Sequence, residues 1–140
     1  MKHWDQTRDS QPAETVPVGR KYRGQLAYHS GLAAENSVEL TYLANGMNLL
    51  CRRWRGPGGE IDLIFADGAR IVFVEVKKAR TFAHAAERIS PRQAGRIATS
   101  AMAFLEGRPA GSLTDMRIDV ALVDQVGAVE VVENAFSGYW

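Results

Sequence analysis

The chain reads GEIDLI at residues 59–64 and VFVEVK at residues 72–77, two apolar runs that charged residues interrupt at regular positions. Successive side chains of a β-strand point to opposite faces of a sheet, so each run has an apolar face and a face that carries charge. Asp67 and Gly68 lie between the runs and favour a two-residue turn. The two runs therefore predict a β-hairpin, and the rest of the fold can be placed around it.

The register of this hairpin follows from its apolar faces. If both apolar faces lie on the same side of the sheet, the numbers of paired residues sum to an odd value, and an Asp67–Gly68 loop makes that sum 135. This register sets Glu60 opposite Glu75 and makes Asp62 a diagonal neighbour of Glu75. We therefore expect four charged side chains on one side of the two strands: Glu60, Asp62, Glu75 and Lys77.

Helix and strand patterns extend on both sides of the hairpin. Apolar residues recur at helical spacing over residues 22–45. Ser90 and Pro91 form a helix start, and this second helix should run to about Leu105. Strands are predicted at residues 47–54, 60–65, 70–77, 117–123 and 128–132. The predicted order is α-β-β-β-α-β-β, an α/β fold with a mixed sheet flanked by helices.

Length and composition favour a single intracellular domain. The chain has 140 residues, a net charge of +1 and one cysteine, Cys51, which cannot form an intramolecular disulfide. Residues 1–19 combine prolines with polar groups and are expected to form a flexible tail, which leaves residues 20–140 as one domain. No apolar run reaches the ~20 residues of a membrane helix. We expect a cytoplasmic protein with no membrane contact.

The three carboxylates of Glu60, Asp62 and Glu75 predict a site for a metal ion. Opposed carboxylates repel one another, and burial adds a cost of several kcal/mol per ion. A hard divalent cation compensates for this repulsion, because Mg²⁺ or Mn²⁺ binds through one or two carboxylates together with waters and phosphate oxygens. Lys77 is suited to orient an attacking water or to neutralise developing negative charge. The alternative is that Lys77 forms an ordinary ion pair with Glu75 or Glu60.

Basic residues concentrate in the middle of the chain. Arg52, Arg53 and Arg55 flank Trp54, a combination that suits phosphate contacts and base stacking. The alternative is that Trp54 belongs to the core and the arginines are solvated. Two further arginines lie one turn apart on the predicted second helix and are candidates to face a nucleic-acid backbone: Arg92 and Arg96. Asp119 follows Arg117 by two residues and is expected to pair with it.

The sequence resembles a known nuclease superfamily. Asp62 followed by Glu75-Val76-Lys77 resembles the Asp, Glu-x-Lys core of the PD-(D/E)xK nucleases, which include restriction endonucleases and archaeal Holliday-junction resolvases. The longer pattern is similar to the YraN-type family of small bacterial predicted endonucleases. Four segments carry this second resemblance: GEIDLI at 59–64, VFVEVK at 72–77, SPRQ at 90–93 and RIDV at 117–120.

The resemblance implies a restriction-endonuclease-like core that hydrolyses phosphodiester bonds in DNA, with branched or damaged DNA as a candidate substrate. It implies Asp62, Glu75 and Lys77 as catalytic residues, and it adds a metal ligand from the first helix, Glu35, to the set of Asp62, Glu75 and Glu60. Gln93 is expected near the metal, and Lys78 and Arg80 near the DNA. A catalytically inactive DNA-binding or adaptor protein remains the alternative function, and the oligomeric state stays open, a homodimer included.

Overall fold

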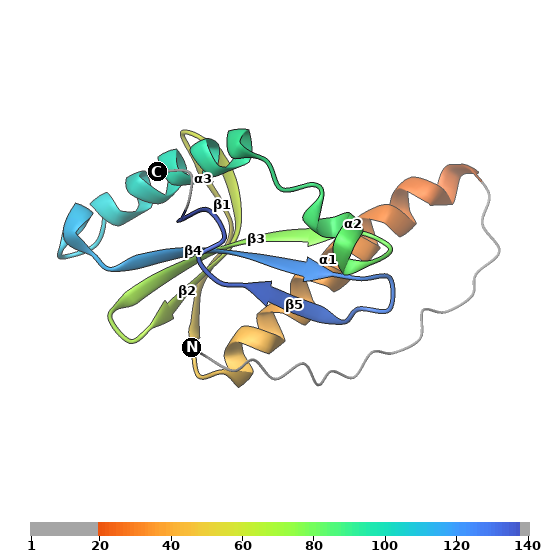
Figure 1. Ribbon diagram of the computed structural model, residues 1–140, viewed down its shortest axis with the longest axis horizontal. Coiled ribbons are helices and arrows are strands. Elements are labelled where there is room, and N and C mark those ends of the chain that lie inside the picture. Colours follow the sequence, from red (N-terminus) through yellow and green to blue (C-terminus); the bar gives the residue numbers. More distant parts are fainter. Residues whose placement is uncertain (1–19, 138–140) are drawn as a thin grey trace.

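The computed structural model describes the backbone of residues 20–137 and the side chains of residues 31–137 (Figure 1). The tail expected at residues 1–19 lies outside these ranges. Four helical segments are present: α1 (Arg20–Ala44), α2 (Phe82–Ala86), α3 (Pro91–Glu106) and the short 3-10 helix η1 (Gly111–Leu113). None of the helices described is both long and apolar enough to span a membrane.

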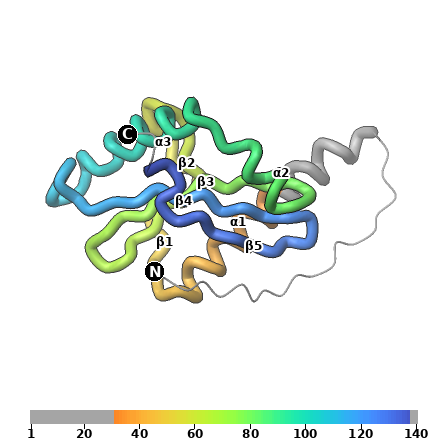
Figure 2. Tube along the Cα trace, viewed as in Figure 1, coloured from red at the N-terminus to blue at the C-terminus, as the bar shows by residue number. Residues whose placement is uncertain are grey.

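Five strands form one mixed sheet in the order β1-β2-β3-β4-β5. Their bounds are β1 (Asn48–Gly56), β2 (Gly59–Asp67), β3 (Arg70–Lys78), β4 (Met116–Val123) and β5 (Val129–Val132). Neighbouring strands are antiparallel except β3 and β4, which run parallel. The trace in Figure 2 shows β1, β2 and β3 as a meander, after which α2 and α3 lead back to β4. The predicted α/β fold and its order α-β-β-β-α-β-β are confirmed, and they are consistent with a nuclease-like core; α2 and η1 are additions.

Two apolar cores, one on each face of the sheet, hold the helices. Alternate residues of β3 belong to different cores, with Phe73 on the α3 side and Val72 and Val74 on the α1 side. The α3 core takes in four residues of α3, Ala94, Ile97, Ala101 and Leu105, together with Ala85 of α2, and the α1 core takes in three residues of α1, Ala34, Val38 and Tyr42. Burial on both faces explains why residues 71–74 form an uninterrupted apolar run.

The β2–β3 register differs from the prediction by two residues. Asp67 pairs with Arg70 and Leu63 with Val74, so the numbers of paired residues sum to 137 rather than 135. The loop consists of Gly68 and Ala69, and Gly68, with φ +61°, takes the first loop position, where a positive φ is required. Pairing ends at Leu63 and Val74, and the same sum of 137 aligns Asp62 with Glu75 just beyond that point, where the two carboxylates share a hydrogen bond.

A change of face in β1 and β2 is a second correction. Ile61 belongs to the α3 core whereas Leu63 belongs to the α1 core, so these two residues do not share the face that strict alternation predicts. Their partners on β1 are Trp54 and Arg52, and between those partners Arg53 has φ 52°. A left-handed residue within a strand rotates the backbone that follows it. The rotation turns Trp54 and Ile61 together toward α3.

The β1–β2 turn packs closely against α3. The Ser100 hydroxyl accepts a hydrogen bond from the Gly58 N–H at 2.9 Å and donates one to the Gly59 carbonyl at 2.8 Å. A Cβ atom on Gly58 would lie 2.1 Å from the Arg96 carbonyl oxygen. Only glycine allows this approach, which fixes the start of β2 against α3.

Gly58→Ala is expected to lower the free energy of unfolding by about 1 to 3 kcal/mol, because the backbone of α3 cannot yield as a flexible side chain does. Urea denaturation followed by circular dichroism measures the change. Gly95→Ala in α3 is the matched control, since an added Cβ there meets nothing within 4 Å and should stabilise the helix by about 0.5 to 1 kcal/mol. Equal effects of the two substitutions would contradict the close packing of the turn.

Candidate active site

The site lies at a fork between β2 and β3. Pairing between these strands runs from Asp67 and Arg70 as far as Leu63 and Val74 and stops there, although both strands continue. Beyond this point the Val76 N–H donates a hydrogen bond to Asp62 Oδ2 at 2.8 Å. The Asp62 carboxylate thus takes the place of a backbone partner, and β3 continues along its other edge in parallel pairing with β4.

Two carboxylates meet at the fork. Glu75 is buried and Asp62 is half-buried, and the two share a hydrogen bond while their charges repel. Burial, followed by the charge of Glu75, raises the pKa of Asp62 to about 7, and the hydrogen bond from Val76 offsets part of this rise. Ionising both carboxylates at once is therefore unfavourable unless a positive charge lies beside them.

Lys77 lies beside this pair and is restrained from two sides. Its Nζ atom is 3.3 Å from Glu75 Oε2, and the two side chains are only 13% and 11% exposed. On the other side the Gln93 amide oxygen accepts a hydrogen bond from Nζ, while the Gln93 amide nitrogen donates to the Arg88 carbonyl at 2.9 Å. Gln93 stands in the first turn of α3, where its N–H donates to the Ser90 hydroxyl. The start of α3 thus positions the lysine.

The two other predicted metal ligands, Glu35 and Glu60, lie near the fork, and each forms an ion pair with an arginine. Glu35 of α1 accepts a hydrogen bond from Arg53 Nε at 3.1 Å; burial raises its pKa, with a smaller rise from the charge of Asp62. Glu60 is 40% exposed and lies 3.9 Å from Arg55, although its charge still contributes to the raised pKa of Asp62. The structure therefore brings Asp62, Glu75 and Lys77 together, and sets Glu35 and Glu60 around them.

The basic residues expected to contact nucleic acid divide into two groups. Those of β1 have acidic partners: Arg52 binds Glu39 through two hydrogen bonds of 2.8 Å, and Arg53 and Arg55 pair with the glutamates described above. Lys78 is half-buried at the end of β3. The remaining three are exposed: Arg80, Arg92 and Arg96. The exposed arginines of α3 are therefore better placed than those of β1 to meet a phosphate backbone.

The donor set fits a hard divalent cation. Within the part of the chain whose side chains are described, no group of three or more histidine, cysteine, aspartate and glutamate residues is arranged to hold a metal ion. Asp62 and Glu75 nevertheless supply two carboxylates at one point, and Mg²⁺ commonly uses one or two carboxylates and takes its remaining ligands from water and phosphate.

A buried ion-pair network supports β4, whose Asp119 pairs with Val74 on the side of β3 opposite the fork. Arg117 pairs with the fully buried Asp119 at 2.8 Å, as the sequence predicts, and also with Glu133 at 3.0 Å. The Tyr42 hydroxyl of α1 donates to the same aspartate at 2.7 Å. Sequence reasoning missed this tyrosine, because an apolar helical period gives no signal for a hydroxyl that reaches across to a strand.

Comparison with known proteins gives a consistent match. A family model described as "Uncharacterised protein family UPF0102" matches residues 34–123, a range that contains the fork. A UPF0102 protein of Cereibacter sphaeroides (strain KD131) is 51% identical over 114 residues, which cover 81% of this chain and 97% of the relative. UPF0102 proteins of Roseobacter denitrificans and Ruegeria pomeroyi are 51% and 54% identical; the matches cover 84% and 81% of this chain, and 92% and 93% of the relatives.

Asp62→Asn is expected to stabilise the metal-free protein at neutral pH. The pKa of Asp62 is higher in the folded state than in the unfolded chain, so the folded state binds more protons between about pH 4 and 7. The stability of the wild type should therefore fall as pH rises through this window. Asparagine cannot titrate, so the free energy of unfolding of the variant should not show this fall. Above pH 7 the variant should be more stable than the wild type by a few kcal/mol, because each unit of pKa difference between the folded and unfolded states corresponds to about 1.4 kcal/mol.

Thermal melts in buffers containing EDTA, taken from pH 4 to 8, measure this difference. Glu130→Gln, which removes an exposed carboxylate from β5, is the control and should follow the wild type. A parallel pH profile for the Asp62 variant and the wild type would contradict the buried carboxylate pair.

Proposed function

The chain belongs to the uncharacterised protein family UPF0102, the YraN-type family of small predicted endonucleases, and we propose that it is a metal-dependent endonuclease that hydrolyses phosphodiester bonds in DNA. One observation carries the proposal. The fork between β2 and β3 gathers two carboxylates that share a hydrogen bond, Asp62 and Glu75, and sets the Lys77 ammonium group 3.3 Å from Glu75.

In this proposal Asp62 and Glu75 hold Mg²⁺ or Mn²⁺ directly, because they are the two carboxylates that share the fork. Bound there, the cation would activate water as a nucleophile and offset the negative charge of the phosphate. Glu35 and Glu60 stand further out and are themselves neutralised by Arg53 and Arg55. Their role is therefore to adjust the charge around the two ligands; direct ligation is the alternative, and the metal titration below tests it for Glu60.

Lys77 supports the reaction through its three N–H donors. Glu75 and Gln93 occupy part of that donor capacity and so fix the direction of the ammonium group. A donor that remains can orient the attacking water or stabilise the negative charge that develops on the phosphate. Because the group is already restrained by α3, it needs little reordering when the substrate binds.

DNA is the proposed substrate, and branched or damaged DNA is the form to test first, since the motifs resemble those of the resolvases. Affinity should depend on Arg92 and Arg96 more than on the arginines of β1, because the latter already have carboxylate partners. Contacts of this kind release counterions, so binding should weaken steeply as salt concentration rises.

Lys77→Ala is expected to lower the rate of DNA cleavage by about 100-fold or more while DNA affinity changes little, because the lysine acts on the transition state rather than on the bound substrate. Cleavage is measured on linear, nicked, flapped and four-way DNA with Mg²⁺ and with Mn²⁺, and affinity is measured on the same DNA in EDTA. Arg92→Ala combined with Arg96→Ala is the complementary variant, expected to weaken binding and to flatten its salt dependence.

The same assay identifies the competing function. A wild-type protein that binds DNA with this salt dependence but cuts none of the four substrates with either metal is a DNA-binding or adaptor protein that uses the nuclease fold without turnover. The ion pair between Lys77 and Glu75 is the observation that favours this second candidate, since it gives the lysine a structural role.

Metal binding provides an independent prediction. Titration calorimetry with Mn²⁺ should detect weak binding to the wild type and none to Asp62→Asn, because few anionic ligands are available and one has been removed. Glu60→Gln is the matched control: it removes a carboxylate that already pairs with Arg55, and it should bind Mn²⁺ nearly as well as the wild type. An equal loss in both variants would make Glu60 a ligand, and unchanged binding in Asp62→Asn would exclude Asp62.

A further inference from the structure

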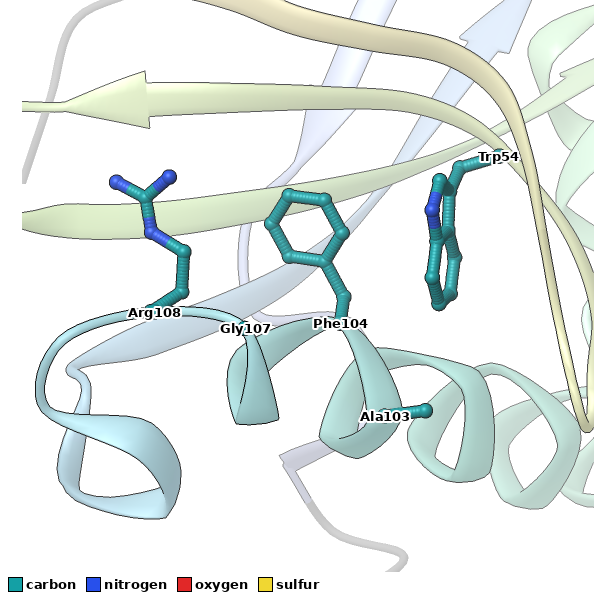
Figure 3. Close-up of a pocket in the computed structure, with 5 residues that line it drawn as sticks. All are labelled: Trp54, Ala103, Phe104, Gly107 and Arg108. Atoms are coloured by element: carbon teal, nitrogen blue, oxygen red, sulfur yellow. The ribbon is translucent and has the colours of Figure 1, made fainter.

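An open hollow lies at the end of α3 opposite the contact between Gln93 and Lys77. Its volume is about 300 Å³, and five residues line it: Trp54, Ala103, Phe104, Gly107 and Arg108. Figure 3 shows Trp54 entering from the strand above the helix, with the Phe104 ring standing between Trp54 and the Arg108 side chain. The hollow thus combines two aromatic rings with one guanidinium group.

The rings are fixed in place by the core. Trp54 and Phe104 contact edge to face with centroids 5.3 Å apart, and Phe104 makes a similar contact of 5.7 Å with the fully buried Phe73. In an edge-to-face pair the rim of one ring covers a face of the other and the two ring planes are perpendicular, so a planar base can stack on only one of the two rings. Trp54 and Phe104 are half-buried and therefore form a rigid aromatic wall open to solvent on one side.

Arg108 supplies a charge without a counterion. Among the residues whose side chains are described, no carboxylate forms an ion pair with it, whereas Arg52, Arg70 and Arg117 each have one. Its side chain is half-buried beside Phe104 rather than extended into solvent. A guanidinium group in this position is matched by a phosphate, which it binds with two parallel hydrogen bonds.

A row of residues along α3 connects the fork to the hollow. Arg92, Arg96 and Ala103 are spaced four and seven apart, so they lie on one face of the helix. The row spans about 16 Å at the helical rise of about 1.5 Å per residue. A DNA strand that leaves the fork over α3 therefore passes two exposed arginines before it reaches the aromatic wall.

We propose that this hollow binds an unpaired nucleobase of the DNA substrate, stacked on the Phe104 ring beside Trp54, with the adjoining phosphate held by Arg108. The inference rests on the proposed function and refines it: the enzyme would prefer DNA with a single-stranded segment beside the cleavage site. Continuous duplex offers no such base, because extruding one from the helix sacrifices its stacking and its pairing.

Fluorescence of Trp54 reports on the hollow directly. The chain contains three tryptophans, and replacing two of them by phenylalanine, Trp4→Phe and Trp140→Phe, leaves Trp54 as the single emitter. In EDTA, a five-nucleotide thymidylate strand should quench this emission and bind at least about fivefold more tightly than an abasic strand of the same length and charge. A duplex with the same number of phosphates should not quench.

Two variants test the assigned contacts. Phe104→Leu retains the apolar volume and should abolish the preference for the thymidylate strand over the abasic one. Arg108→Ala should weaken both strands equally and lower the salt slope by about one. Arg70→Ala is the control that also removes one arginine; its charge is already neutralised by Asp115 at 3.0 Å, and affinity should not change.

The outcomes separate this inference from the proposed function, since no step of the binding assay requires cleavage. Equal affinity for thymidylate and abasic strands, or unchanged Trp54 emission, overturns the base-binding hollow even if the protein cuts DNA. Quenching with the expected preference supports the hollow even if no substrate is cut, in which case the endonuclease proposal alone fails.

Discussion

The hydrogen bond from the Val76 N–H to the Asp62 carboxylate is the interaction on which the site depends. A sheet that opens between two strands leaves backbone donors without partners, and a buried unpaired donor is costly. The Asp62 side chain accepts a hydrogen bond from one of these donors, the Val76 N–H. The same contact holds the Asp62 carboxylate in place where the two strands separate. Glu75 and Lys77 directly flank Val76 in β3, so strand alternation places both side chains on the same face of the sheet.

The carboxylates around the fork and those inside it differ in how fully their charge is compensated. Glu35, Glu39 and Glu60 lie around the fork, and each has its own arginine from β1. The carboxylates inside the fork share a single lysine. Because the surrounding glutamates are paired with arginines, the excess negative charge is confined to the two carboxylates inside the fork. The exposed arginines of α3 have no such carboxylate partner among the described residues.

The sequence allowed the element order, the helix boundaries and the grouping of Asp62, Glu75 and Lys77 to be predicted, because apolar periodicity and strand alternation carry that information. The register was wrong by two residues, since either Asp67 or Gly68 can begin a two-residue loop and only the backbone of Gly68 decides between them. The face change at Arg53 had no signal, because arginine rarely adopts a positive φ. Phe104 and Arg108 were missed, because only tertiary packing brings them beside Trp54.

The parallel pairing of β3 with β4 has a consequence for the nascent chain. The meander that contains the whole fork leaves the ribosome before residues 79–115, which must be synthesised before β4 can pair. Until then one edge of β3 presents unpaired backbone groups beside an apolar run, a combination that promotes self-association. Glu75 and Lys77 interrupt that run at its end, and charges placed in this way oppose aggregation of the unpaired strand while the rest of the chain is made.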